Sequence, residues 1–120
     1  MLSGLVILIS MQGQAAETVN LSGDWEIHSS VGGATPITVN CSLKHVDAVL
    51  SGSCTPVMDN AQPSQLDGHT DGTTGQWGYD VVFNANPGRV DFSADSLSQD
   101  LMTGTLSLSG TEAPFEAQRR

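Results

Sequence analysis

The feature that most constrains the fold of this chain is a two-residue alternation of apolar and polar residues. It is strictest in segment 37–43, ITVNCSL, where the odd positions are apolar or cysteine and the even positions are polar. Successive side chains of a β-strand point to opposite faces, so this pattern predicts a strand with one buried face. No segment of the chain carries a convincing helical period.

The same alternation recurs along the chain and predicts eight short strands. We place them at 23–29, 36–43, 50–55, 65–70, 76–83, 90–94, 102–108 and 115–119, with turns at 44–49, 84–88 and 95–100. Thirteen glycines suit many tight turns, and the connections are short enough for hairpins. The prediction is an all-β, eight-stranded antiparallel up-and-down barrel, which removes its edge strands by closing. A β-sandwich, the alternative, needs a long crossing connection, for which only 56–64 is a candidate.

The two cysteines fit one hairpin of this barrel. Pairing Cys41 with Cys54 in an antiparallel ladder also places Leu43 opposite Gly52, so that leucine and cysteine share one face. A directly opposed pair brings the two Cβ atoms close enough for a bridge. We therefore predict a disulfide between Cys41 and Cys54, and free thiols are the alternative.

Residues 1–16 have the pattern of a secretory signal peptide. An apolar run at 5–9 is followed by small residues up to Ala16, although no basic residue precedes the run. The run is too short for a bilayer, which takes about 20 residues, so no membrane insertion is predicted. A buried helix is the alternative interpretation. The prediction is a secreted or periplasmic protein with its barrel at 17–120, where a disulfide can persist.

Charge and motifs exclude several classes of function. The formal net charge is −9 with four basic residues, which argues against nucleic acid and against an anionic membrane surface. The three histidines and the scattered aspartates lack metal-ligand spacing, and no nucleophile motif is present, so we assign no catalytic residue, metal or cofactor. A carboxylate and imidazole pair, such as Glu26 with His69, leaves a barrel isomerase or lyase as the weakest alternative.

The aromatic residues are the candidates for ligand binding. Trp77 and Tyr79 lie on the richest apolar face of the chain, and Phe92 alternates on the next strand. An eight-stranded interior is just wide enough for packed side chains or for one small ligand. We predict either a binding barrel for a small hydrophobic molecule, contacted by these three residues, or a packed structural or protein-interaction domain without a cavity. No protein partner can be named.

A large apolar residue is followed two positions later by glycine at several predicted strands. The pairs are Leu21 with Gly23, Leu50 with Gly52, Leu66 with Gly68 and Met102 with Gly104. Glycine inside a strand costs stability, so its recurrence indicates sharply coiled strands or space for a neighbouring ring. We interpret the pattern as barrel geometry and not as a binding motif.

The segment Gly23-Asp24-Trp25 at the first strand, with Arg119 on the last, resembles the signature of the calycin group, the lipocalins and avidins. In that group a glycine-x-tryptophan opens the barrel, and an arginine from the final strand packs on the indole. The resemblance implies structural roles for Trp25 and Arg119 and a ligand-binding or accessory function without catalysis. The ending Phe115-x-Ala-x-Arg119 also resembles small exported bacterial proteins of unassigned function.

Overall fold

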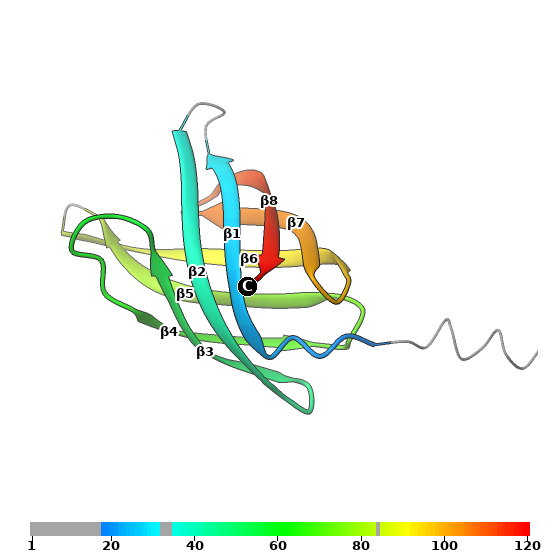
Figure 1. Ribbon diagram of the computed structural model, residues 1–120. Coiled ribbons are helices and arrows are strands. Elements are labelled where there is room, and N and C mark those ends of the chain that lie inside the picture. The colour runs from blue at the N-terminus through cyan, green and yellow to red at the C-terminus, as the bar shows by residue number, and fades with distance from the viewer. Residues whose placement is uncertain (1–17, 32–34, 84) are drawn as a thin grey trace, which may run out of the picture.

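The described chain is a closed barrel of eight antiparallel strands, as predicted (Figure 1). The computed structural model describes residues 18–31, 35–83 and 85–120, and the predicted leader at 1–16 lies outside them. Each strand pairs with the next in sequence, and β8 pairs with β1. The strands are β1 (Gly23–Val31), β2 (Thr35–Val46), β3 (Val49–Pro56), β4 (Ser64–Thr70), β5 (Gly75–Phe83), β6 (Asn86–Leu97), β7 (Leu101–Leu108) and β8 (Thr111–Arg119). In the described part, no helical segment has the length and hydropathy of a membrane crossing.

Several strands are longer than their apolar alternation predicted. The predicted turn at 44–49 is reduced to Asp47 and Ala48, because β2 and β3 pair as far as Val46 opposite Val49. Asp47 reaches this tight turn with a φ of 56°. Likewise β6 begins at Asn86, inside the predicted turn at 84–88. Apart from Leu50 and Val90 at their inner limits, the residues of these extensions are exposed or half-buried, so cross-strand hydrogen bonds and not apolar burial define their ends.

The cysteine hairpin has the predicted register. Cys41 lies opposite Cys54, and Leu43 lies opposite Gly52. The two cysteines form a disulfide with a Cα–Cα distance of 4.0 Å. Both are buried, so the bridge lies on the inner face of the wall formed by β2 and β3.

Aromatic side chains occupy the middle of the barrel. The ring of Phe92 stacks on Trp77 at 5.1 Å between centroids and meets Phe115 edge to face at 5.5 Å. Tyr79 stacks on the same Phe92 ring at 6.2 Å. Offset-stacked and edge-to-face pairs of this kind stabilise a core beyond the burial of their area. The inner faces of β5, β6 and β8 are thus packed against one another.

A short N-terminal segment, Thr18–Ser22, crosses one end of the barrel, and we call it the strap. Its Leu21 is fully buried, and the carbonyl of Leu21 accepts a hydrogen bond of 2.9 Å from the indole nitrogen of Trp25. The guanidinium of Arg119 lies 4.4 Å from the centre of the Trp25 ring, within cation–π distance. Arg119 also donates to the carbonyl oxygens of Asn20 and Ser22. Trp25 and Arg119 therefore close this end together with the strap.

Close approach between strands accounts for two of the recurrent glycines. A methyl group on Gly104 would overlap the backbone carbonyl of Ser93 on β6. On Gly52, with a φ of 123°, it would overlap the carbonyl of Ser42 on β2. These positions need the smallest residue because the coiled strands bring backbone against backbone there.

Candidate functional site

The three aromatic residues predicted to bind a ligand all point into the barrel. Trp77, Tyr79 and Phe92 are 1–2% exposed and pack on one another. Burial raises the pKa of the Tyr79 phenol to about 12. The indole N–H of Trp77 is buried and has no hydrogen-bond partner within the described chain.

A hollow lies on the outer face of β4 to β8. It has a volume of about 500 Å³ and is lined mainly by polar side chains that point away from the core. The ladder registers arrange these side chains in two parallel rows across the strands, which we call the outer rows. The first row consists of Asp67, Gly78, Asp91, Ser107 and Glu112. The second row consists of His69, Gln76, Ser93 and Thr105.

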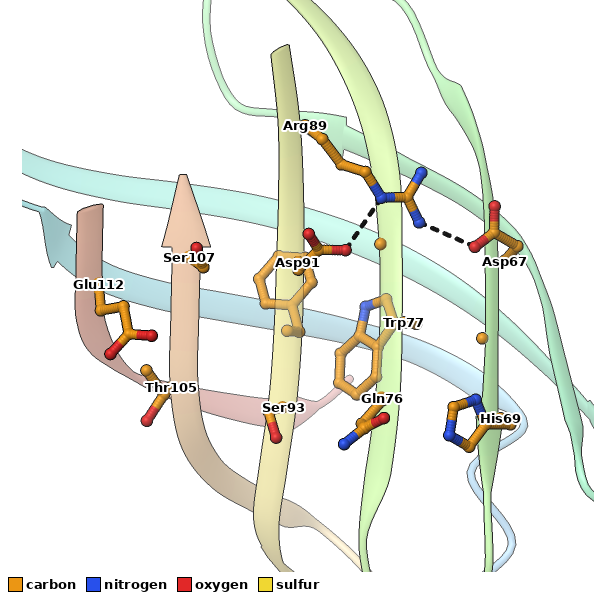
Figure 2. Close-up of a pocket in the computed structure, with 13 residues that line it drawn as sticks. Asp67, His69, Gln76, Trp77, Arg89, Asp91, Ser93, Thr105, Ser107 and Glu112 are labelled. Carbon is orange, nitrogen blue, oxygen red and sulfur yellow. Dashed lines mark hydrogen bonds and ion pairs between the residues drawn. The ribbon is translucent and has the colours of Figure 1, made fainter. Parts of the chain in front are cut away.

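Both rows follow from alternation combined with register. Trp77 points inward, so its neighbours Gln76 and Gly78 lie on the outer face. Gly78 belongs to the first row and Gln76 to the second. Gln76 lies directly opposite His69 on β4 and opposite Ser93 on β6. Figure 2 shows the labelled polar residues of neighbouring strands side by side in this arrangement.

Arg89 lies across the first row at Gly78. Its guanidinium donates to Asp91 at 3.0 Å on its own strand and to Asp80 at 3.2 Å on β5. It also reaches over β5 to Asp67 on β4 at 2.8 Å (Figure 2). A methyl group on Gly78 would overlap the Asp91 carboxylate and crowd the guanidinium, so glycine makes room for this crossing. The hydrogen bond with Asp91 is the largest cause that raises the pKa of Arg89, and bonds with Asp67 and Asp80 add to it.

The outer rows can hydrogen-bond a ligand that both donates and accepts. Carboxylates accept, the guanidinium donates, and hydroxyl and amide side chains do both. Asp67, Asp91 and Glu112 outnumber Arg89, so the hollow carries a negative charge with histidine neutral. Among the residues that the structure describes, no three histidine, cysteine or acidic side chains are grouped to hold a metal ion.

The remaining sequence candidates lie elsewhere. Glu26 on β1 contacts His28 at 3.4 Å, whereas His69 belongs to the second outer row on β4, so the suggested proton-transfer pair is not formed. A second hollow of about 370 Å³ lies over β1 to β3, where Arg120 donates to Asn40 at 3.2 Å. Its lining includes Ser42 and Ser53, which lie opposite each other.

The outer rows are not predicted from the sequence. Their residues occupy the outward-facing, polar positions of the predicted strands. The sequence signal for them is therefore the polar member of each alternating pair. A row across five strands is defined only when four successive registers are known, and only the register of the cysteine hairpin had been derived.

Fold and site together define the class of the protein: a small, disulfide-bonded, closed antiparallel barrel with a polar hollow on its outer face. Comparisons with protein-family models, with curated proteins and with solved structures find no match to this chain.

Proposed function

We propose that this protein is an exported, non-enzymatic binding barrel that holds a short linear oligosaccharide, neutral or amine-bearing, across its outer rows. The observation that carries the proposal is the alignment of polar side chains in two rows, the first over five neighbouring strands and the second over four. Neighbouring strands lie about 4.8 Å apart, so the first row extends over about 19 Å and the second over about 14 Å.

The chemistry of the rows supports this choice of ligand. A sugar hydroxyl both donates and accepts, which matches the mixed serine, threonine, glutamine and carboxylate groups. The hollow extends across several strands of the outer face, which suits an elongated ligand that lies across them. Its negative charge disfavours a polyanionic sugar and favours an amine-bearing one.

The proposal also includes an exported location and a calycin-like ancestry. The Cys41–Cys54 bridge is compatible with an oxidising compartment and supports a secreted or periplasmic location. The contact of Arg119 with Trp25 supports a calycin-like ancestry, in which binding on an outer face would replace binding inside the barrel.

Titration of isotope-labelled protein with short β-linked oligomers of a neutral hexose and of an amino sugar tests the proposal. We expect amide shifts that concentrate along the outer rows. Ser93→Ala and Gln76→Ala each remove a hydrogen-bonding group, so each should weaken binding about fivefold, or about 1 kcal/mol.

Ser53→Ala is the matched control, because this serine points outward from β3 into the second hollow and not into the outer rows. It should leave the Kd unchanged. The proposal is wrong if neither oligomer shifts the outer rows, or if Ser53→Ala weakens binding as much as Ser93→Ala.

A second candidate function is binding of a small hydrophobic molecule inside the barrel, in contact with Trp77, Tyr79 and Phe92. It is favoured by the indole N–H of Trp77, which would bind an acceptor atom of such a ligand. Native mass spectrometry of protein purified from its own host is the test. A co-purified apolar molecule that is lost in Trp77→Phe supports this function, and its absence from the intact protein contradicts it.

A further inference from the structure

The strap is held at several places on the end of the barrel. The amide of Val19 donates to the carbonyl of Gly72 in the β4–β5 turn at 3.1 Å. Arg119 binds the carbonyls of Asn20 and Ser22, as described above.

His45, near the end of β2, makes two further contacts with the strap. Its backbone N–H donates to Oγ of Ser22 at 2.9 Å, and its ring accepts from the N–H of Leu21. The ring contact differs from the others because an imidazole can gain a proton.

The contacts of His45 require one protonation state. Leu21 N–H donates to Nδ1 of His45 at 3.0 Å, so Nδ1 carries no proton. Nε2 lies 2.9 Å from the backbone carbonyl of Asp47, which can only accept, so Nε2 carries the proton. The imidazole is therefore neutral, and both of its nitrogens are occupied.

Protonation of this ring is incompatible with the strap contact. A proton on Nδ1 would face the N–H of Leu21, which turns a hydrogen bond into a repulsion. Leu21 is fully buried, and its carbonyl is the acceptor for Trp25 Nε1. Movement of Leu21 would thus remove the side chain that covers this end of the barrel and the hydrogen bond that orients Trp25.

We propose that His45 is an acid-sensitive latch, which holds the strap over the Trp25 end of the barrel when neutral and releases it when protonated.

Other ionisable groups at this end do not supply such a change. They are Lys44 and Asp47 on the hairpin of His45, Asp24 on β1, His69 on β4, Asp71 in the β4–β5 turn, Asp95 and Asp100 near the β6–β7 turn, and Arg119 and Arg120 at the end of β8. Asp71 stays ionised, because hydrogen bonds from the backbone of Thr74 and Thr73 lower its pKa to about 2. His69 is the other imidazole at this end, and it points outward in the second outer row. It therefore provides the control.

Amide hydrogen exchange measured by NMR tests the latch. Release should lower the protection factor of the Leu21 amide at least tenfold between about pH 7.5 and about pH 5, because a proton on Nδ1 removes the acceptor of that amide. The amide of Leu50, inside β3, should keep its protection, which separates strap release from global unfolding. The latch is refuted if the protection of Leu21 does not change with pH.

Two variants test whether His45 causes the acid response of the Leu21 amide. His45→Asn keeps an acceptor at the position of Nδ1 but cannot be protonated, so its Leu21 protection should not depend on pH. His69→Asn should respond like the unsubstituted protein. An undiminished acid response in His45→Asn contradicts the proposal.

Nitrogen NMR of the ring tests the same proposal without a substitution, should His45→Asn fail to fold. At about pH 7.5, long-range proton–nitrogen spectra should identify His45 as the Nε2–H form. A proton found on Nδ1 would refute the latch, because that nitrogen could then not accept from Leu21.

Discussion

Gly78 has no side chain, and this absence allows the long side chain of Arg89 to lie across β5. The guanidinium crosses β5 only because nothing projects from Gly78 beneath it. It then joins carboxylates from three strands, at distances of 2.8 to 3.2 Å. These pairs are partly exposed, so each contributes little to stability, and their main effect is to fix the shape and charge of the hollow.

Tyr79 permits a prediction on pH dependence at the same scale. Burial favours its neutral form and raises its pKa to about 12, from about 10 in an unfolded chain. The resulting stability is fully present below pH 10 and is lost as the pH rises through 12. Two pKa units correspond to about 2 to 3 kcal/mol.

Because the chain has a single tyrosine, the ultraviolet absorbance of tyrosinate reports on Tyr79 alone. We expect the folded protein to titrate at least one unit above the same protein in denaturant. Equal midpoints in the two states would contradict the burial of this phenol.

Among the elements, β7 depends most directly on a missing side chain. Gly104→Ala would drive a methyl group into the backbone of β6 at Ser93 and Ala94, and backbone cannot move aside as a flexible side chain does. We expect a loss of more than about 2 kcal/mol in the free energy of unfolding, measured with urea.

Gly75→Ala is the control for this prediction. A methyl group there would lie 3.5 Å from Cδ1 of Leu21, an ordinary contact, so the loss should stay near or below about 1 kcal/mol. Similar losses in the two variants would mean that β6 and β7 are not as close at Gly104 as described.

The strands also show how much of the fold can be predicted from the sequence. Alternation located all eight strands, and the cysteine register followed from the coincidence of leucine and cysteine on one face. The ends of β2 and β6 were missed, because residues such as Val46 and Asn86 pair through their backbones while their side chains stay exposed. The outer rows were missed for a related reason, since contacts across five strands depend on registers that apolar patterning does not specify.

For the whole molecule, the disulfide is the covalent constraint on unfolding. It joins positions 13 residues apart in sequence, and closing such a loop in the unfolded chain corresponds to about 3 kcal/mol. We expect the double substitution Cys41→Ala with Cys54→Ala to lower the free energy of global unfolding by about this amount, measured by chemical denaturation.

The adjacent pair Ser42 and Ser53 offers a matched control, since these residues are also directly opposed but point outward. Replacing both by alanine should change stability by no more than about 1 kcal/mol. A cysteine-free protein as stable as the original would show that the bridge does not constrain the unfolded chain.

The pairing of β8 with β1 has a consequence for recognition. Along the body of the barrel, the described strands have neighbours on both sides, so a foreign peptide cannot extend the sheet there as a ninth strand. At the tip of the β5–β6 hairpin the situation differs, because the pairing of β5 with β4 stops at Tyr79 while its pairing with β6 continues to Phe83. A partner that binds main chain to main chain can attach at a projecting edge such as this one, whereas a partner that binds the body of the barrel must be recognised through side chains.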